Sequence, residues 1–256
     1  MYTYFVKYRF SDKHATVLRR LYEKVPPGLS LSESATYALR EAILDGLLPA
    51  HTPLVEEALV ETFGISRTPV REALQRVTAD RLVVRISGQA VVASITDEDI
   101  LAIYMLREAL EGLAARVASV KAGPELADEL TEINDQLKAC LERGEIAETL
   151  DMNVRFHRLI CSAADSLYID YFSTQLEHAV RRARASSGDR KDLAKALAMS
   201  VEEHSAIIAG MRSDDPAAAE AATIRHLRLA RERTMNRLRR NTYELTGGSR
   251  LSGLPV

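Results

Sequence analysis

Apolar residues recur every three or four positions along most of this 256-residue chain, a spacing that is typical of helices. One such stripe runs through residues 64–77 and consists of Val70, Ala73, Leu74 and Val77. Gly64 precedes the stripe, and Ser66 stands where an N-cap side chain accepts a hydrogen bond from a backbone amide of the first turn. The pattern therefore predicts a helix that begins directly after a glycine turn.

A shorter apolar stripe precedes Gly64 and predicts another helix. It consists of Leu54, Ala58, Leu59 and Phe63. Two helices joined by a glycine turn are typical of a helix-turn-helix. Arg67, Thr68 and Arg71 lie off the apolar stripe near the start of the second helix, where a recognition helix meets base edges in the DNA major groove. The pattern therefore favours a DNA-binding unit.

Two runs of β-branched residues follow the helix-turn-helix. Residues 82–84 and 90–93 are rich in valine, and a Ser87-Gly88 pair lies between them. Such runs around a short turn predict a β-hairpin, which would form the wing of a winged helix-turn-helix. A further helix is expected before the helix-turn-helix, at Ser34–Leu47.

Helical periodicity dominates the chain after Thr96. Three acidic residues follow Thr96, and acids are favoured at the positive, N-terminal end of a helix. Helices are expected at residues 100–120, 124–143, 146–164, 167–185, 193–211 and 216–240. Six long helices with short loops predict an antiparallel bundle. The expected fold is therefore mainly α, with an N-terminal winged helix-turn-helix, a small β-hairpin wing and a C-terminal all-α antiparallel helical bundle.

These patterns divide the chain into four parts. Residues 1–33 are an N-terminal extension of unknown role, with five aromatic residues near its start, and residues 34–95 are the DNA-binding domain. Residues 96–241 form the helical domain. Residues 242–256 contain three glycines and are expected to be a flexible tail.

Acidic and basic residues nearly balance, with a formal net charge of −2. Residues 34–94 contain six arginines, no lysine and seven acidic residues. A basic patch, which is the usual sign of a DNA-binding surface, is therefore absent from the sequence. DNA binding must instead depend on local clustering of Arg67, Arg71 and Arg76, and on two copies of the chain in each complex.

The sequence shows no sign of a membrane or secreted protein. No apolar run approaches the roughly 18 residues of a membrane span, and no signal peptide is visible. Cys140 and Cys161 do not resemble a disulfide framework. A cytoplasmic protein without a membrane partner is expected.

Three histidines of the helical domain are candidate metal ligands. Asn153 and His157 are four residues apart and share one helical face, while His204 and His226 lie on two later helices. Helical bundles build metal sites from side chains of facing helices, and three neutral imidazoles suit zinc, nickel or another late first-row ion. Asn153 could add its carbonyl oxygen. The alternative is that the histidines are scattered structural residues.

Arginines of the helical domain allow two interpretations. Arg107 lies in an otherwise apolar helix and could hold a carboxylate with both arms of its guanidinium. Alternatively, it forms a salt bridge with Glu108 or Glu111. The last helix carries many arginines, which are expected to face solvent, with DNA contact as the alternative: Arg225, Arg228, Arg231, Arg233, Arg237, Arg239 and Arg240.

The segment Gly64–Leu74, with the sequence GISRTPVREAL, resembles the signature of the GntR-type bacterial transcription regulators. The helical part resembles the FCD domain of the FadR-like branch, which binds an effector and mediates dimerisation. The resemblance implies DNA contacts by Ser66, Arg67, Thr68 and Arg71, and a wing tip at Ser87-Gly88 that reaches the minor groove. It also implies metal ligation by Asn153, His157, His204 and His226, and an effector-binding role for Arg107.

Three positions depart from the family pattern. Glu57 stands where relatives often have a basic residue near the phosphates, and Arg81 replaces the usual glycine before the wing. Asn153 stands where aspartate is common, which removes a negative charge. A divalent ion with three neutral histidines would keep a net charge near +2. This charge favours an anionic effector, and a small carboxylate is expected.

The function expected from these features is that of a ligand-responsive transcription regulator, most simply a repressor, and not of an enzyme. It would bind a palindromic double-stranded DNA operator as a homodimer, under the control of a small organic acid bound near a divalent metal, zinc or nickel. One alternative is a metal-dependent hydrolase on a helical bundle. The other is a dimeric DNA binder that responds to no effector.

Overall fold

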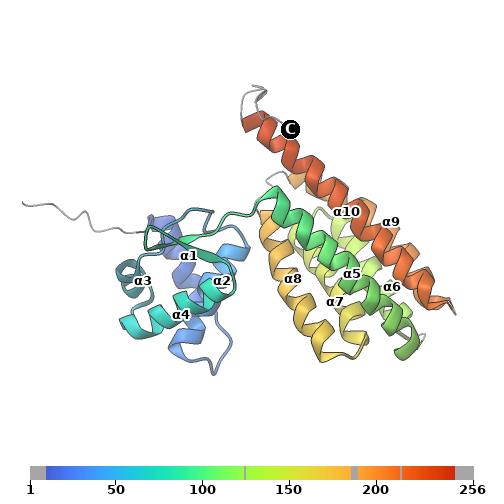
Figure 1. The fold of residues 1–256 in the computed structure, drawn as a ribbon, viewed down its shortest axis with the longest axis horizontal. Coiled ribbons are helices and arrows are strands. Elements are labelled where there is room, and N and C mark those ends of the chain that lie inside the picture. Colours follow the sequence, from blue (N-terminus) through green and yellow to red (C-terminus); the bar gives the residue numbers. More distant parts are fainter. Residues whose placement is uncertain (1–9, 124, 186–189, 214, 246–256) are drawn as a thin grey trace, which may run out of the picture. The chain divides into compact units, whose positions relative to one another are not determined.

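A computed structural model describes residues 10–123, 125–185, 190–213 and 215–245 (Figure 1). The chain forms two compact units, with the division between Ile95 and Thr96. Within the described ranges, no helix is long and apolar enough to cross a membrane.

The first unit has the expected winged helix-turn-helix fold. Its elements are α1 (Asp12–Glu23), α2 (Leu31–Leu44), α3 (Glu56–Phe63), α4 (Arg67–Ala79), β1 (Val83–Ile86) and β2 (Gln89–Val92). The two strands pair antiparallel, and Ile86 faces Gln89 across the turn. Ser87 and Gly88 form this turn with φ angles of 50° and 83°. Positive φ at both positions is the geometry of a type I′ hairpin turn, whose twist matches that of the strands.

The helix-turn-helix is set by Gly64, which ends α3 in the left-handed conformation with a φ of 68°. Ser66 is the N-cap of α4, as its position predicts. The predicted hydrogen bond of its side chain is wrong, because the Ser66 side chain makes no capping contact. Ser66 is exposed, so water can satisfy the amides of the first turn instead.

The N-terminal extension contributes a helix to the core of the first unit. Leu18 of α1 is fully buried, and the ring of Tyr22 stacks on that of Phe63 with 4.9 Å between the centroids. The predicted boundary at residues 33 and 34 falls inside α2, because Ser30 and Glu33 form a capping box that starts this helix at Leu31. Four of the five aromatic residues near the N-terminus, between positions 1 and 9, lie outside the described residues.

The second unit contains the six helices that the sequence predicts. They are α5 (Asp97–Lys121), α6 (Glu125–Glu142), α7 (Ile146–Ala163), α8 (Leu167–Ala185), α9 (Arg190–Arg212) and α10 (Pro216–Leu245). Thr96 caps α5 in a capping box with Asp99. Helix α10 continues to Leu245, so the predicted tail begins in a helix, and its remainder, 246–256, lies outside the described residues.

Helices α5 and α10 run side by side through the second unit (Figure 1). Gly112 on α5 lies so close to Ile224 that a Cβ at this glycine would be 2.8 Å from the Ile224 Cγ1. A similar close approach joins α9 to α10 at Gly210. These tight contacts fix the helices that carry the polar residues described below. Both cysteines have free thiols.

Candidate metal centre and nucleic-acid interface

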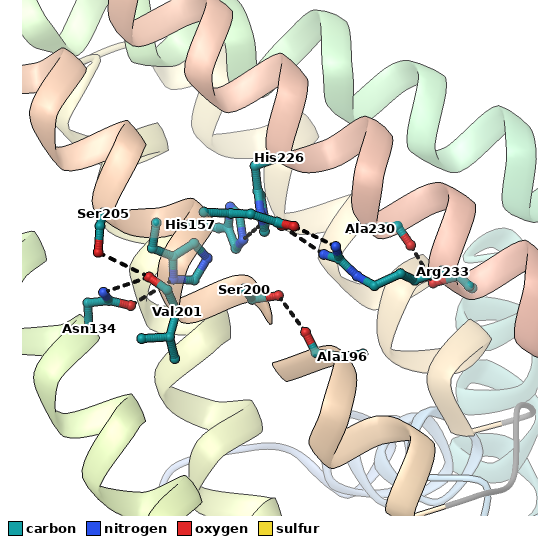
Figure 2. Close-up of polar contacts among 12 residues, drawn as sticks. Asn134, His157, Ala196, Ser200, Val201, Ser205, His226, Ala230 and Arg233 are labelled. Atoms are coloured by element: carbon teal, nitrogen blue, oxygen red, sulfur yellow. Dashed lines mark hydrogen bonds and ion pairs between the residues drawn. The ribbon is translucent and has the colours of Figure 1, made fainter. Parts of the chain in front are cut away.

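Three helices bring His157, His204 and His226 together in the interior of the second unit. Each ring is buried, and one nitrogen from each ring lies within 4.8 Å of the others. The Nε2 atoms of His157 and His226 are 3.2 Å apart (Figure 2). Phe156 stacks on the His204 ring with 3.9 Å between the centroids, which fixes the orientation of that imidazole.

The Nδ1 atom of each ring faces a side-chain oxygen of a neighbouring helix. His226 Nδ1 lies 2.8 Å from Glu203 Oε2, and His204 Nδ1 lies 3.1 Å from Asn134 Oδ1. His157 Nδ1 lies 2.9 Å from Glu111 Oε2, at ion-pair distance but without the alignment of a hydrogen bond.

These contacts leave the Nε2 atoms available to an ion, and those of His157 and His226 face each other. A partner on the second ring nitrogen is the usual arrangement of a metal-ligating histidine, because it fixes the ring and its tautomer.

The residues present fit a divalent late first-row ion. His204 Nε2 is buried and has no hydrogen-bond partner within the described part of the chain, a cost that a metal bond would remove. The separation of 3.2 Å between the Nε2 atoms of His157 and His226 matches two nitrogens bound to one ion, which tetrahedral Zn–N bonds of about 2.0–2.1 Å place about 3.3 Å apart.

Burial keeps the imidazoles neutral, which is the form that binds metals. Desolvation lowers the pKa of His157 to about 4, although Glu111 opposes this shift. Desolvation also lowers the pKa values of His204 and His226. Burial acts to raise the pKa of Glu111, but the Arg107 guanidinium and His157 outweigh it, and the pKa lies well below its ordinary value.

Asn153 lies one turn before His157 on α7 and is 3% exposed. Residues four apart on a helix share a face, so its amide is on the side of α7 that carries His157. Asn153 therefore remains a predicted ligand beside the three histidines that the structure groups.

Arg107 forms the salt bridge that the sequence offered as an alternative. It is 5% exposed, and its Nε donates to Glu111 Oε1 at 2.5 Å. The other candidate partner, Glu108, pairs instead with Arg228 and Arg231 of α10. Because Glu111 also faces His157, the Arg107 guanidinium is one carboxylate away from the histidine cluster.

The prediction that the arginines of α10 face solvent is wrong for two of them. Arg233 donates to both oxygens of Glu203, at 2.5 and 2.8 Å, and Arg237 is 6% exposed. Figure 2 shows Arg233 and Asn134 on opposite sides of His157 and His226. The side chains of Arg239 and Arg240 lie outside the described residues.

Three residues support the histidines in a way that was not predicted from the sequence, namely Glu111, Asn134 and Glu203. One signal was available for Glu111, which lies four residues after Arg107 and therefore on the same face of α5. No local pattern marks Asn134 or Glu203, since their partners come from other helices.

The candidate DNA-contacting residues of α4 are exposed. Ser66 and Thr68 lie at its N-terminal end. Arg67 and Arg71 have side chains that are 64% and 60% exposed. Ser87 and Gly88 form the exposed tip of the hairpin. The six residues thus lie on the surface of one unit.

The position before the wing has the backbone conformation that suits the usual glycine. Arg81 adopts a φ of 57°, in the left-handed region that costs a non-glycine residue about 1–2 kcal/mol. Arg81 therefore adopts the backbone conformation that is expected of the usual glycine at this position.

Two family models match the chain. The one described as "Bacterial regulatory proteins, gntR family" matches residues 31–92, and the one described as "FCD domain" matches residues 102–229. The first match covers α2 to the hairpin, and the second covers α5 to the middle of α10.

Named relatives agree with these matches. The chain is 31% identical over 157 residues to the "Gluconate operon transcriptional repressor" of Bacillus subtilis (strain 168), which covers 59% of this chain and 64% of that protein. The chain thus spans less than two thirds of that repressor, and 54% of its Bacillus licheniformis counterpart. The "Probable D-xylose utilization operon transcriptional repressor" of Paenarthrobacter nicotinovorans is 30% identical over 188 residues, 72% of this chain and 80% of that protein.

Among solved structures, E. coli McbR/YncC has the same fold, with a TM-score of 0.65 at 20% identity, over 85% of this chain and 99% of that one. The family matches, the relative from Paenarthrobacter and this common fold agree with one another. The chain therefore belongs to the GntR family of bacterial regulatory proteins, which are transcription regulators rather than enzymes, and it carries an FCD domain.

Proposed function

We propose that this protein is a transcriptional repressor that binds a palindromic operator as a homodimer and releases it when a small carboxylate binds near a metal ion in the second unit. The observation that carries the ligand response is the convergence of three buried, neutral imidazoles, each with its Nδ1 facing a fixed oxygen. A buried cluster of this kind is costly without a ligand and is well suited to a divalent cation.

His157, His204, His226 and Asn153 would hold the ion, for which zinc and nickel are the best candidates. When bound, the ion supplies a positive charge that attracts and orients an anionic oxygen. The charges around the cluster support this role. The Arg107–Glu111 and Arg233–Glu203 pairs are each neutral in sum, so a divalent ion beside neutral histidines gives the site a charge near +2.

Arg107 is the residue proposed to bind the effector. Its guanidinium lies beside the cluster and pairs with the Glu111 carboxylate. An effector carboxylate could exchange with Glu111 for this guanidinium, because arginine recognises carboxylates with two parallel hydrogen bonds. The exchange would alter α5 at the site where Glu111 supports His157.

DNA binding is assigned to the exposed end of α4 and to the wing. Arg67 is proposed to contact a guanine, with Ser66, Thr68 and Arg71 beside it, while Ser87 and Gly88 reach the minor groove. Two copies would place their recognition helices in successive major grooves, about 34 Å apart. Since DNA is its partner, the cytoplasm of a bacterium is the proposed location.

The names of two relatives support repression. They are a gluconate operon repressor and a probable D-xylose utilization operon repressor, so control of carbon-source operons occurs among similar proteins. We infer that this chain also acts as a repressor, and the charge near +2 at the proposed metal site favours a small organic acid as its inducer.

Elemental analysis of the purified protein tests the proposal first, beside the variant His157→Ala/His204→Ala. About one zinc or nickel ion per chain, lost in the variant, is expected. A panel of small carboxylic acids should then raise the melting temperature of the metal-loaded protein and weaken its operator binding. Protein that holds no metal after reconstitution, and an operator affinity that no acid changes, would favour a DNA binder without an effector.

A further inference from the structure

Two glutamates at the start of α3 lie against the exposed arginines of α4. Glu56 Oε2 accepts a hydrogen bond from Arg71 Nε at 2.8 Å, and Glu57 Oε1 lies 3.4 Å from Arg67 Nη2. The glutamate side chains are 28% and 47% exposed. Each arginine that is proposed to touch DNA thus already has a carboxylate beside it, on the same surface.

These carboxylates compete with DNA phosphates for the same guanidinium groups. A carboxylate and a phosphate both accept parallel hydrogen bonds from arginine, so a phosphate contact requires the arginine to leave its glutamate or to hold both anions. The phosphate is also repelled by the glutamate nearby. This competition involves two of the six arginines in residues 34–94. The same segment contains no lysine and seven acids, so few other cations are available for phosphate contacts.

The competition is weaker where an arginine reads a base. The N7 and O6 acceptors of guanine carry no formal charge, so a nearby carboxylate does not repel them as it repels a phosphate. Glu56 contacts Arg71 through Nε, which leaves both terminal nitrogens to form a bidentate pair with a base. The glutamates therefore oppose backbone contacts more than base contacts.

A simpler role for the glutamates is to stabilise α3. Acidic residues in the first turn complement the positive end of a helix, and Glu56 and Glu57 occupy that turn. This role predicts an effect on stability alone. It does not predict a change in the relative affinity for operator and unrelated DNA, which separates the two explanations.

We propose that Glu56 and Glu57 determine DNA specificity, by shielding Arg71 and Arg67 from phosphates and so lowering the affinity for unrelated DNA more than that for the operator. The inference rests on the proposed contacts of Arg67 and Arg71 with DNA. Replacement of either glutamate would make the protein bind more tightly and less selectively.

Two DNA probes are needed to test this inference on the full-length protein. One is a random-sequence duplex, and the other is an operator recovered from a random duplex pool by selection with the wild-type protein. In Glu57→Gln and in Glu56→Gln, the affinity for the random duplex should rise about two- to fivefold, the range expected for an exposed charge pair. Its salt dependence should steepen by about one unit of slope. The operator affinity should rise less, so that the ratio of the two affinities falls.

The variant Glu23→Gln is the matched control. Glu23 is an exposed residue of the same unit, and the variant makes the same change in net charge without touching either arginine. Glu57→Gln should also lose its effect in an Arg67→Ala background, because Glu57 acts through that arginine. Thermal melting of each variant checks the folded state.

An unchanged affinity ratio in both glutamate variants would overturn the inference, as would an equal effect of Glu23→Gln. Failure of the underlying proposal would be seen separately. In that case, Arg67→Ala would bind the selected operator as tightly as the wild type does. Loss of operator binding in Arg67→Ala together with an unchanged ratio in Glu57→Gln would retain the DNA contacts and reject the shielding.

Discussion

Glu203 supports the histidine cluster through its contacts with His226 and Arg233. Its carboxylate lies 2.8 Å from His226 Nδ1 and accepts two hydrogen bonds from Arg233. Desolvation acts to raise the pKa of Glu203, but His226 and Arg233 outweigh it and keep the group ionised. The charge is therefore available to hold the imidazole in the orientation that turns Nε2 toward the other rings.

Glu203→Gln should weaken metal binding by about 10- to 100-fold, the usual effect of losing such a partner. The amide keeps the shape of the side chain but removes the charge that faces His226. Competition for Zn²⁺ with a chromophoric chelator measures the change. Glu202→Gln is the matched control, since Glu202 is the adjacent exposed residue. Equal affinities in both variants would show that Glu203 does not support the ligand.

The buried histidines also predict how stability depends on pH in metal-free protein. The folded state holds the pKa of His157 at about 4, whereas an unfolded histidine takes up a proton near 6.5. Between these values the unfolded state binds more protons, so the free energy of unfolding falls as pH falls. For His157 the loss is about 3 kcal/mol at most.

Urea unfolding at about pH 7 and about pH 5, with a chelator present, measures this loss. His157→Gln/His204→Gln should show a smaller difference between the two pH values, because two of the groups that resist protonation are gone. An equal or larger pH dependence in the variant would assign the effect to other groups, such as His226, whose pKa burial also lowers.

At the scale of helices, the close approach of α9 and α10 depends on Gly210. A Cβ there would lie 2.8 Å from Ala219 Cα and 2.9 Å from its backbone nitrogen. Backbone atoms cannot move aside without a shift of the whole helix. Gly210→Ala should therefore lower the free energy of unfolding by about 1–3 kcal/mol, as measured by denaturant titration.

Gly112→Ala is the comparison, because the nearest atoms to a Cβ at Gly112 would all belong to side chains, namely Glu220 Cγ at 3.7 Å and two atoms of the Ile224 side chain at 2.8 and 3.0 Å. That side chain can change rotamer, and alanine is favoured over glycine within a helix by about 1 kcal/mol. A net change of less than about 1 kcal/mol is expected. A larger cost at Gly112 than at Gly210 would contradict this account of the packing.

The order of the helices could be predicted from the sequence, whereas some of their ends could not. Periodicity identified the six helices of the second unit, since each buries a stripe of apolar residues over several turns. The start of α2 was missed because the helix continues through Ser32 and Ser34, which are buried. The cap at Ser30 depends on Glu33, a local hydrogen-bond pair that apolar periodicity does not register.

At the scale of the whole molecule, the sequence could single out the three histidines but not what surrounds them. The three histidines meet only when α7, α9 and α10 pack in one particular register. The family resemblance, and not the spacing of the residues, implied that they meet. Asn134 and Glu203 come from helices whose faces are settled only when the bundle packs. Arg233 was predicted to face solvent for the same reason, since an arginine on a charged helix carries no sign of a buried partner.

The proposed response to an effector would couple the metal site to DNA binding, and a substitution at Arg107 can separate this response from metal binding and from DNA binding. Arg107→Lys keeps the positive charge beside Glu111 and so avoids a buried, unpaired carboxylate, which would cost about 3–5 kcal/mol. It removes the planar fork that binds a carboxylate with two hydrogen bonds.

Metal content and operator affinity without effector should therefore stay as in the wild type. A carboxylate that weakens operator binding by about 5- to 150-fold in the wild type, the usual range of allosteric coupling, should have little or no effect on operator binding in Arg107→Lys. Operator titrations with and without the acid measure the coupling. Since the coupling is reciprocal, operator DNA should also weaken binding of the acid to the wild type and not to the variant. A full response in Arg107→Lys would mean that the metal alone recognises the effector.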